Sequence, residues 1–192
     1  MGRMAGMSDE QIRAASVGGA PRQYLDIVVA DYDPEWPEWF EGAAEGIRAA
    51  LGETALEIHH VGSTSVPGLM AKPLIDINLV VADTTDEEAD VPQLEAAGYV
   101  LRVREPDWFE HRMLRGFEPP VNLHVFPLGC SEVKRMLLFR DWLRTNDADR
   151  ELYARTKRAL GAQEWKYVQN YADAKTAVVE EILKRATADP TA

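Results

Sequence analysis

A run of small polar residues separates two apolar stretches near the middle of the sequence. It consists of Gly62, Ser63, Thr64 and Ser65. Their backbone N–H groups and closely spaced hydroxyls suit an anion such as a phosphate better than they suit core packing. Lys72 follows the run and can pair with a phosphate as a point charge, or extend its aliphatic part along the loop edge. We predict a phosphate-binding loop, with a purely structural turn as the alternative.

A carboxylate interrupts the apolar stretch that follows this loop. Asp76 lies in LIDINLVV, where strand alternation places Asp76 and Asn78 on one face and the two isoleucines on the other. Burying an unpaired carboxylate would cost roughly several kcal/mol, so we expect Asp76 at an open cleft, near a cation or heavily hydrogen-bonded. We predict a functional role for Asp76, the alternative being a buried acceptor for N–H groups of the loop.

Histidines lie close to these residues in the predicted strands. In VNLHVF, alternation places Asn122 and His124 on one face, and we predict both as site residues. His60 precedes the polar run, where a histidine is as well suited to a core hydrogen bond as to a site. We keep His60 as a candidate and expect His59, which faces the other side, to be structural.

Basic residues crowd two predicted strands of this acidic protein. They are Arg102, Arg104, Arg112 and Arg115. Such residues can line a cleft for an anionic substrate, or they can form ordinary cross-strand ion pairs. We retain Arg112 as a site candidate. For Arg140 and Lys175, in predicted helices, ion pairing is the default expectation and a phosphate contact is the alternative.

The pattern of apolar residues predicts the elements that must position these side chains. Strands are expected at 25–30, 54–61, 74–81, 99–103, 108–114 and 121–128, and helices at 33–52, around 94–97, and in three segments from residue 131 onward. The result is an α/β or α+β fold: a mixed sheet of five or six strands flanked by helices, with a helical C-terminal segment. We expect residues 1–23 to be a flexible arm, with a short helix starting at Ser8, and residues 24–187 to form a single domain.

Composition excludes several classes of function. The chain has 192 residues and a net charge of −11, which argues against broad binding to nucleic acid or to an anionic membrane. Cys130 is the single cysteine, so an internal disulfide is excluded and a reducing compartment is indicated. The sequence contains neither a long apolar run nor a signal-peptide pattern. We predict a cytoplasmic protein without a membrane partner; the sequence names no protein partner.

The polar run is not one of the common phosphate motifs, since the spacing of its glycines does not fit a Walker loop. Instead the chain resembles the GrpB family, which belongs to the nucleotidyltransferase superfamily and is similar to a domain fused to some dephospho-CoA kinases. The resemblance covers residues 25–186. It rests on HVGSTSVPGLMAKPLIDI, on YDPEWPEWF upstream, and on NLHVF, FRDWLR and YADAK downstream.

This resemblance implies roles for individual residues. Gly62 and Ser63 match the pair that holds nucleotide phosphates, and Asp76 matches the first metal-binding carboxylate. The second carboxylate is replaced by Asn78, whose amide oxygen can ligate Mg²⁺ but brings no negative charge. In VNLHVF, His124 stands where a third carboxylate is expected. The implied metal site is Asp76, Asn78 and His124, for Mg²⁺ or Mn²⁺, a softer transition metal, or no metal.

The resulting hypothesis is a protein that binds a nucleotide or CoA-like phosphate ligand. Nucleotidyl transfer with a divalent metal is the reaction implied by the resemblance, with Asp76 and His124 as catalytic residues. The alternative is a non-catalytic ligand-binding or regulatory module that kept the fold and lost the metal carboxylates, which the presence of Asn78 favours. A third hypothesis is hydrolysis of a phosphorylated metabolite at a histidine-containing metal site.

Overall fold

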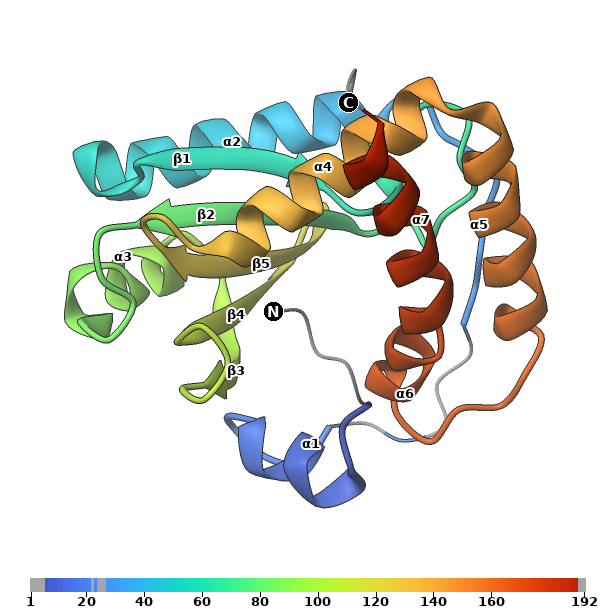
Figure 1. Ribbon diagram of the computed structural model, residues 1–192. Helices are drawn as coiled ribbons and strands as arrows, with labels where there is room; N and C mark the ends of the chain where they lie inside the picture. Colours follow the sequence, from blue (N-terminus) through green and yellow to red (C-terminus); the bar gives the residue numbers. More distant parts are fainter. Residues whose placement is uncertain (1–5, 22, 24–26, 190–192) are drawn as a thin grey trace.

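The computed structural model describes residues 6–21, 23 and 27–189. The strands are β1 (Glu57–Val61), β2 (Ile75–Val81), β3 (Val100–Glu105), β4 (His111–Phe117) and β5 (Pro120–Pro127). The helices are α1 (Asp9–Ala15), α2 (Trp36–Leu51), α3 (Val91–Ala96), α4 (Ser131–Thr145), α5 (Asp147–Gly161), α6 (Val168–Asp173) and α7 (Thr176–Ala188). Figure 1 shows the sheet between α2 and α3 on one face and the C-terminal helices on the other.

The strands form one mixed sheet of five strands in the order β1-β2-β5-β4-β3. Among the described residues, only β2 and β5 pair in parallel, and α3 and the β3–β4 hairpin form the long connection between them that a parallel pair needs. The mixed sheet confirms the predicted fold class. The strand expected at 25–30 was wrong for the part that is described: Ala30 makes a single bridge to Ala71, and residues 25 and 26 lie outside the described residues.

The face of the sheet under α2 and α3 carries the main hydrophobic core. Alternate residues of β2 and β5 point into it, as the period-two pattern predicted. Trp36 and Ile47 of α2 are fully buried against them, while Trp39 packs at the edge. The opposite face is therefore where Asp76 and His124 lie.

Helices α4, α5 and α7 pack together beside this second face. Val66 and Leu69, in the loop after β1, are buried against Leu143, Tyr153 and Ile182 of these helices. The last predicted helix is divided into two helices in the structure: α6 ends at Asp173, and α7 begins at Thr176. The loop that we expect to hold phosphate is thus clamped between the sheet and the helices.

The N-terminal segment contains the helix predicted from Ser8. Ser8 and Gln11 form a complete capping box, and Ile12 is buried. Ser16 bridges to Val103 of β3. In the described part of 1–23, the expected arm therefore packs against the sheet edge instead of standing free. Across the described part of the chain, no helix has the length and apolar character needed to cross a membrane.

Candidate functional site

The register of β2 and β5 places the predicted strand residues side by side. Asp76 pairs with Asn122, and Asn78 pairs with His124. The Asn122 side-chain amide donates to Asp76 Oδ1 over 3.0 Å, and Arg115 Nη1 donates to Asn122 Oδ1 over 2.8 Å. Asp76 is thereby anchored on the face opposite α2.

The loop after β1 brings its backbone against the Asp76 carboxylate. Gly62 has a φ of 70°, in the left-handed region that favours glycine. A Cβ atom at this position would lie 2.4 Å from Asp76 Oδ2. The close approach of loop and carboxylate therefore requires glycine.

Only part of the predicted phosphate loop is open to a ligand. Thr64 and Ser65 are buried; Ser65 Oγ donates to the Gly62 carbonyl over 2.6 Å, and Thr64 Oγ1 lies 3.1 Å from His60 Nε2. These hydroxyls hold the turn together, in contrast to the phosphate-binding role predicted for them. Ser63 is half-buried, and its hydroxyl has no hydrogen-bond partner among the described residues. Gly62 and Ser63 therefore remain the loop candidates.

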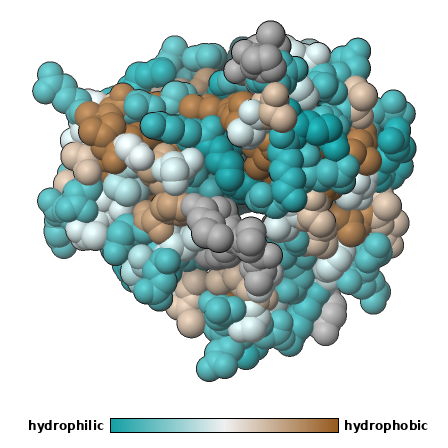
Figure 2. All heavy atoms as spheres, viewed as in Figure 1, coloured by the Kyte–Doolittle hydropathy of each residue, from teal (hydrophilic) through white to brown (hydrophobic). Residues whose placement is uncertain are grey.

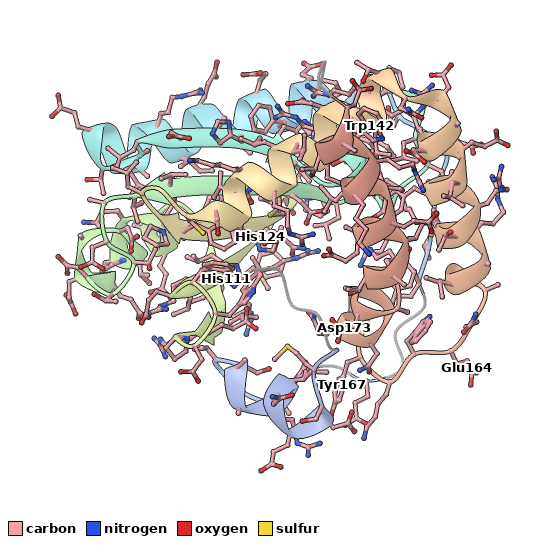
Figure 3. All side chains as sticks on the ribbon, in the orientation of Figure 1. His111, His124, Trp142, Glu164, Tyr167 and Asp173 are labelled. Atoms are coloured by element: carbon pink, nitrogen blue, oxygen red, sulfur yellow. The ribbon has the colours of Figure 1, made fainter. Side chains whose placement is uncertain are left out.

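A chain of polar side chains leads from β3 to Asp76. Glu105 Oε2 lies 2.7 Å from His111 Nδ1, and His111 Nε2 lies 3.0 Å from His124 Nδ1. His124 Nε2 is 3.7 Å from Asp76 Oδ1. In Figure 3 the two labelled histidines lie next to each other on the strands. His124 thus lies beside Asp76, and it links His111 and Glu105 to Asp76.

Cationic side chains gather near Asp76. Lys72 follows the loop, Lys157 lies in α5, and Lys175 immediately precedes α7. Burial lowers the pKa of Lys72, and Lys175 and Arg115 lower it further while Asp76 opposes them. Burial also lowers the pKa of Arg115, again with Asp76 in opposition. Figure 2 shows a group of hydrophilic residues near the centre of this face. Such a concentration of positive charge in an acidic protein attracts an anion.

The ammonium groups of Lys157 and Lys175 each lie over a tyrosine ring. Lys157 Nζ donates to the Met70 carbonyl, and burial, with the charge of Lys175, lowers the pKa of Lys157 to about 7. Lys175 Nζ lies 4.6 Å from the centroid of the Tyr171 ring. The Tyr171 hydroxyl is buried and has no hydrogen-bond partner in the described ranges. This buried hydroxyl belongs to the ring against which Lys175 lies.

The surroundings keep Asp76 ionised. Its side chain is 29% exposed. Burial alone would raise its pKa, but His124, the hydrogen bond from Asn122 and the charge of Lys72 together lower the pKa below its ordinary value. The carboxylate is therefore hydrogen-bonded and near a cation, as the sequence led us to expect.

Asn78 does not join Asp76 at an open site. It is fully buried, its Nδ2 lies 3.4 Å from Met136 Sδ of α4, and its Oδ1 has no partner within the described part of the chain. This burial conflicts with the metal-binding role predicted for Asn78. In the described residues, no group of three or more His, Cys, Asp or Glu side chains is arranged to hold a metal ion. The donor set does not fit the multi-carboxylate metal centre that the resemblance implies.

His60 points away from Asp76. Its Cα partner is Ile77, on the core face, and its ring stacks on Phe40 of α2 with 4.7 Å between centroids. Burial lowers the pKa of His60 to about 4. His60 instead lines a cavity of about 300 Å³ with side chains that include Phe40, Arg140 and Arg144. Its candidacy for the Asp76 site was therefore wrong.

Arg112 also points away, towards the far end of the sheet. Its Cα partner on β5 is the core residue Val125. Arg112 Nε donates to Glu87 Oε1 over 2.5 Å, and Arg104 pairs with the same carboxylate. Hydrogen bonds from Arg104, with those from Arg112, lower the pKa of Glu87 to about 2. These two arginines therefore form ion pairs, but with Glu87 of a short 3-10 helix and not across strands as the alternative expected.

Sequence reasoning missed four residues of the site, namely Glu105, His111, Lys157 and Tyr171. His111 and Glu105 were overlooked, although alternation along β4 places His111 on the face of Met113 and Arg115, which pair with His124 and Asn122. No local signal marks Lys157, which is one charged residue among many in α5. It reaches the site only through helix packing.

Comparisons with known proteins found relatives that match most of the chain. The family described as GrpB protein matches residues 26–185. UPF0157 protein BH1888 of Halalkalibacterium halodurans is 55% identical over 181 residues, which cover 94% of this chain and 93% of that protein. The crystal structure of conserved protein GrpB from Enterococcus faecalis matches with a TM-score of 0.69 at 31% identity, covering 83% of this chain and 96% of that one.

The chain is also similar to part of a larger protein. A dephospho-CoA kinase of Mycolicibacterium paratuberculosis is 31% identical over 153 residues, covering 66% of this chain and 38% of the kinase. A crystal structure of the Cid1 poly(U) polymerase matches at 13% identity with a TM-score of 0.45, too low to support an argument. With the family match over residues 26–185 and a relative that is 55% identical along nearly its whole length, this chain belongs to the GrpB family.

Proposed function

We propose that this GrpB-family protein binds a small phosphorylated ligand, a nucleotide or a CoA-like molecule, on the Asp76 side of the sheet. The observation that carries the proposal is the gathering of Lys72, Lys157, Lys175 and Arg115 near Asp76 in a chain of net charge −11. Ammonium and guanidinium groups bind phosphate oxygens through charge-assisted hydrogen bonds. The Tyr171 hydroxyl, which lacks a partner among the described residues, supports the same conclusion, since a phosphate oxygen would accept a hydrogen bond from it.

The catalytic form of this proposal is nucleotidyl transfer with Mg²⁺ or Mn²⁺. A nucleotide would bring the ion on its phosphates, and Asp76 is the carboxylate beside which the ion would lie. Bound there, the ion would neutralise charge that develops on the transferred and leaving phosphates. The residues of this chain would orient the phosphates through Lys72, Lys175 and the Gly62–Ser63 backbone.

A non-catalytic module is the second candidate. Asn78 favours it, because an amide stands where the metal chemistry uses a second carboxylate, and this amide is buried beneath Met136. Such a module would bind the phosphorylated ligand through the same cationic residues. It would not need a metal ion, so metal dependence separates the two candidates.

The test is calorimetric titration with ATP and with CoA, each with and without Mg²⁺ or Mn²⁺. Wild type should bind at least one of them, and Lys175→Met should weaken binding about tenfold or more, since a charged hydrogen bond contributes about 1.5–3 kcal/mol. Lys184→Met is the matched control: Lys184 is exposed on α7, so its removal should leave the affinity unchanged. Absence of binding by wild type, or equal losses in the two variants, would refute the proposed function.

Two more variants decide between the candidates. If Asp76→Asn abolishes metal-dependent binding and diphosphate release from ATP, transfer chemistry is supported. If binding is metal-independent and survives in Asp76→Asn, the non-catalytic module is supported. Asn78→Leu should leave binding intact in either case, because Asn78 is fully buried beneath Met136.

A further inference from the structure

A second cavity lies along the free edge of the sheet. β1 is the edge strand, and Figure 1 shows it between α2 and α4. Three consecutive residues of β1, Ile58, His59 and His60, line this cavity of about 300 Å³. Successive side chains of a strand point to opposite faces, so a cavity that meets all three reaches the unpaired edge of β1. The cavity lies apart from Asp76 and the lysines near it, which are not among its lining residues.

Two arginines from successive turns of α4 form a charged wall of this cavity. Arg140 Nη1 donates to the His60 carbonyl over 3.0 Å. Arg144 donates twice to the Ser65 carbonyl, over 3.0 Å from Nε and over 2.8 Å from Nη2. Both arginines also donate to Asp141. A guanidinium has more N–H groups than the three hydrogen bonds that each arginine makes within the described part of the chain, so N–H groups remain for a ligand.

The charges of this wall are only partly compensated. Arg140 and Arg144 share one carboxylate, that of Asp141, whose side chain is 53% exposed. Burial, together with the charge of Arg140, lowers the pKa of Arg144, because like charges disfavour each other. His60 is uncharged at neutral pH, since its pKa is lowered to about 4. An anion in the cavity is therefore stabilised by guanidinium charge that Asp141 leaves uncompensated.

Aromatic rings line the same cavity. The Phe40 ring of α2 stacks on the His60 ring with 4.7 Å between centroids and 8° between planes. Tyr32, which precedes α2, also lines the cavity, and both Tyr32 and Phe40 are half-buried. At such rings an aromatic ligand gains stacking in addition to the burial of its apolar surface. The lining thus combines a surface for a ring with a surface for an anion.

We propose that this cavity is a second binding site, for a small aromatic carboxylate. The carboxylate pairs with the remaining N–H groups of Arg140 and Arg144, and the ring lies against Phe40 and Tyr32. The planar fork of a guanidinium matches the two oxygens of a carboxylate, which favours this anion. The inference goes beyond the proposed function, because it concerns another ligand in another cavity and holds whether or not a phosphorylated ligand binds near Asp76.

The test is ¹H–¹³C NMR of the histidine rings in the full chain at pH ~7.5, titrated with 2-naphthoate. The chain has four histidines: His59 and His60 line the cavity, whereas His111 and His124 lie next to each other on β4 and β5. The signals of the first pair should shift and saturate, because the ring current of a bound naphthalene acts on nearby protons, and those of the second pair should stay in place. Absence of a saturable shift, or shifts that include His111 and His124, would overturn the proposal.

Two further probes separate the charge from the ring. Acetate carries the carboxylate without the ring, and 2-naphthol carries the ring without the carboxylate. Each should bind at least about tenfold more weakly than 2-naphthoate, because each lacks one of the two interactions. Binding of either probe as tight as that of 2-naphthoate would overturn the assignment of an aromatic carboxylate.

Arg144→Gln should weaken the binding of 2-naphthoate about tenfold, because a charged hydrogen-bond donor is lost. Arg155→Gln is the matched control: Arg155 is exposed on α5, where it pairs with Glu151, and its replacement should leave the affinity unchanged. Unchanged signals of His111 and His124 show that a variant is folded. Equal affinities of Arg144→Gln and wild type would contradict the proposed role of the arginine wall.

Glu41→Gln should produce a gain in affinity, which a folding defect does not explain. Glu41 lines the cavity from α2 and is exposed, so its carboxylate repels an anionic ligand. Its replacement should tighten the binding of 2-naphthoate about two- to threefold at low salt. Glu45→Gln is the control, since Glu45 is exposed on the next turn of α2 and does not line the cavity. Weaker binding by Glu41→Gln, or an equal gain in Glu45→Gln, would count against an anion in this cavity.

Discussion

Gly62 and Asp76 are in such close contact that a single added carbon atom would not fit between them. The absent side chain of Gly62 makes room for Asp76 Oδ2, and the positive φ turns the loop backbone towards the carboxylate. Asn122 then fixes the other carboxylate oxygen.

We expect Gly62→Ala to abolish ATP binding and to lower the free energy of unfolding by about 2–4 kcal/mol, since a Cβ meets Asp76 Oδ2 and the backbone is strained. Gly68→Ala is the control. Gly68 also has a positive φ, of 77°, but its Cβ would meet no atom within 4 Å, so only the strain cost of about 1–2 kcal/mol applies. Urea unfolding and calorimetry measure both; equal losses would show that the contact with Asp76 is unimportant.

His60 should make stability depend on pH. Its pKa is lowered to about 4 in the folded protein, so below pH 6.5 the unfolded chain binds a proton that the folded chain does not. Its stabilising contribution is therefore complete above pH 6.5 and is lost as pH falls towards 4, by about 3 kcal/mol in all. His60→Gln should flatten this part of the stability curve in urea unfolding between pH 4 and 7. A variant with the wild-type slope would contradict the assignment.

At the scale of elements, α4, α5 and α7 form the frame that delivers Lys157 and Lys175. Asp149 of α5 links all three helices: it accepts from Arg185 of α7 over 2.6 Å and 3.0 Å, and from Trp142 Nε1 of α4 over 2.7 Å. Its side chain is 8% exposed, whereas that of Arg185 is 40% exposed. The position of the cationic residues therefore depends on this junction.

We expect Asp149→Asn to reduce the free energy of unfolding by about 1–3 kcal/mol, a range discounted because Arg185 is partly solvated. Asp147→Asn provides the control, since Asp147 pairs with Arg150 at 2.7 Å but is 87% exposed. Its loss should change stability by less than about 1 kcal/mol. Thermal and urea unfolding compare the two variants, and similar losses would mean that the junction adds nothing beyond a surface pair.

Across the whole molecule, charge is distributed unevenly. The chain carries 32 acidic and 21 basic residues, yet several basic side chains converge near Asp76. An acidic protein repels free nucleotides at long range, so binding relies on this local concentration of positive charge. Long-range repulsion is screened by salt, whereas partly buried contacts are screened less.

ATP should accordingly raise the melting temperature. At a hundredfold excess over Kd the stabilisation is about 2.7 kcal/mol, which corresponds to a shift of roughly 5–10 °C for a domain of this size. Lys175→Met should lose most of this shift, and Lys184→Met should keep it. Because the contacts are partly buried, raising the salt from about 0.05 M to about 0.3 M should reduce the wild-type shift only in part. Complete loss in moderate salt would indicate a surface ion effect.

Much of the fold follows from local sequence patterns. The alternation in LIDINLVV and VNLHVF predicted which residues of β2 and β5 face Asp76 and which face the core, because a strand repeats every two residues. The capping box at Ser8 and the apolar spacing of α2 were also readable, since both are set within a few residues. The break between α6 and α7 was missed because the amphipathic pattern continues across it.

The features of the site also separate into those set by local sequence and those set by tertiary packing. By itself the sequence determined the Gly62–Ser63 turn, Asp76, and the shared face of Asn122 and His124, because these depend on local backbone geometry and on strand period. Only the tertiary structure decided that Thr64, Ser65 and Asn78 are buried, and that His60 and Arg112 face elsewhere. It also decided that Lys157 and Lys175 lie near Asp76 and that His111 contacts His124. Those outcomes depend on which surfaces pack together, and packing brings residues together across long stretches of chain where no sequence spacing records their proximity.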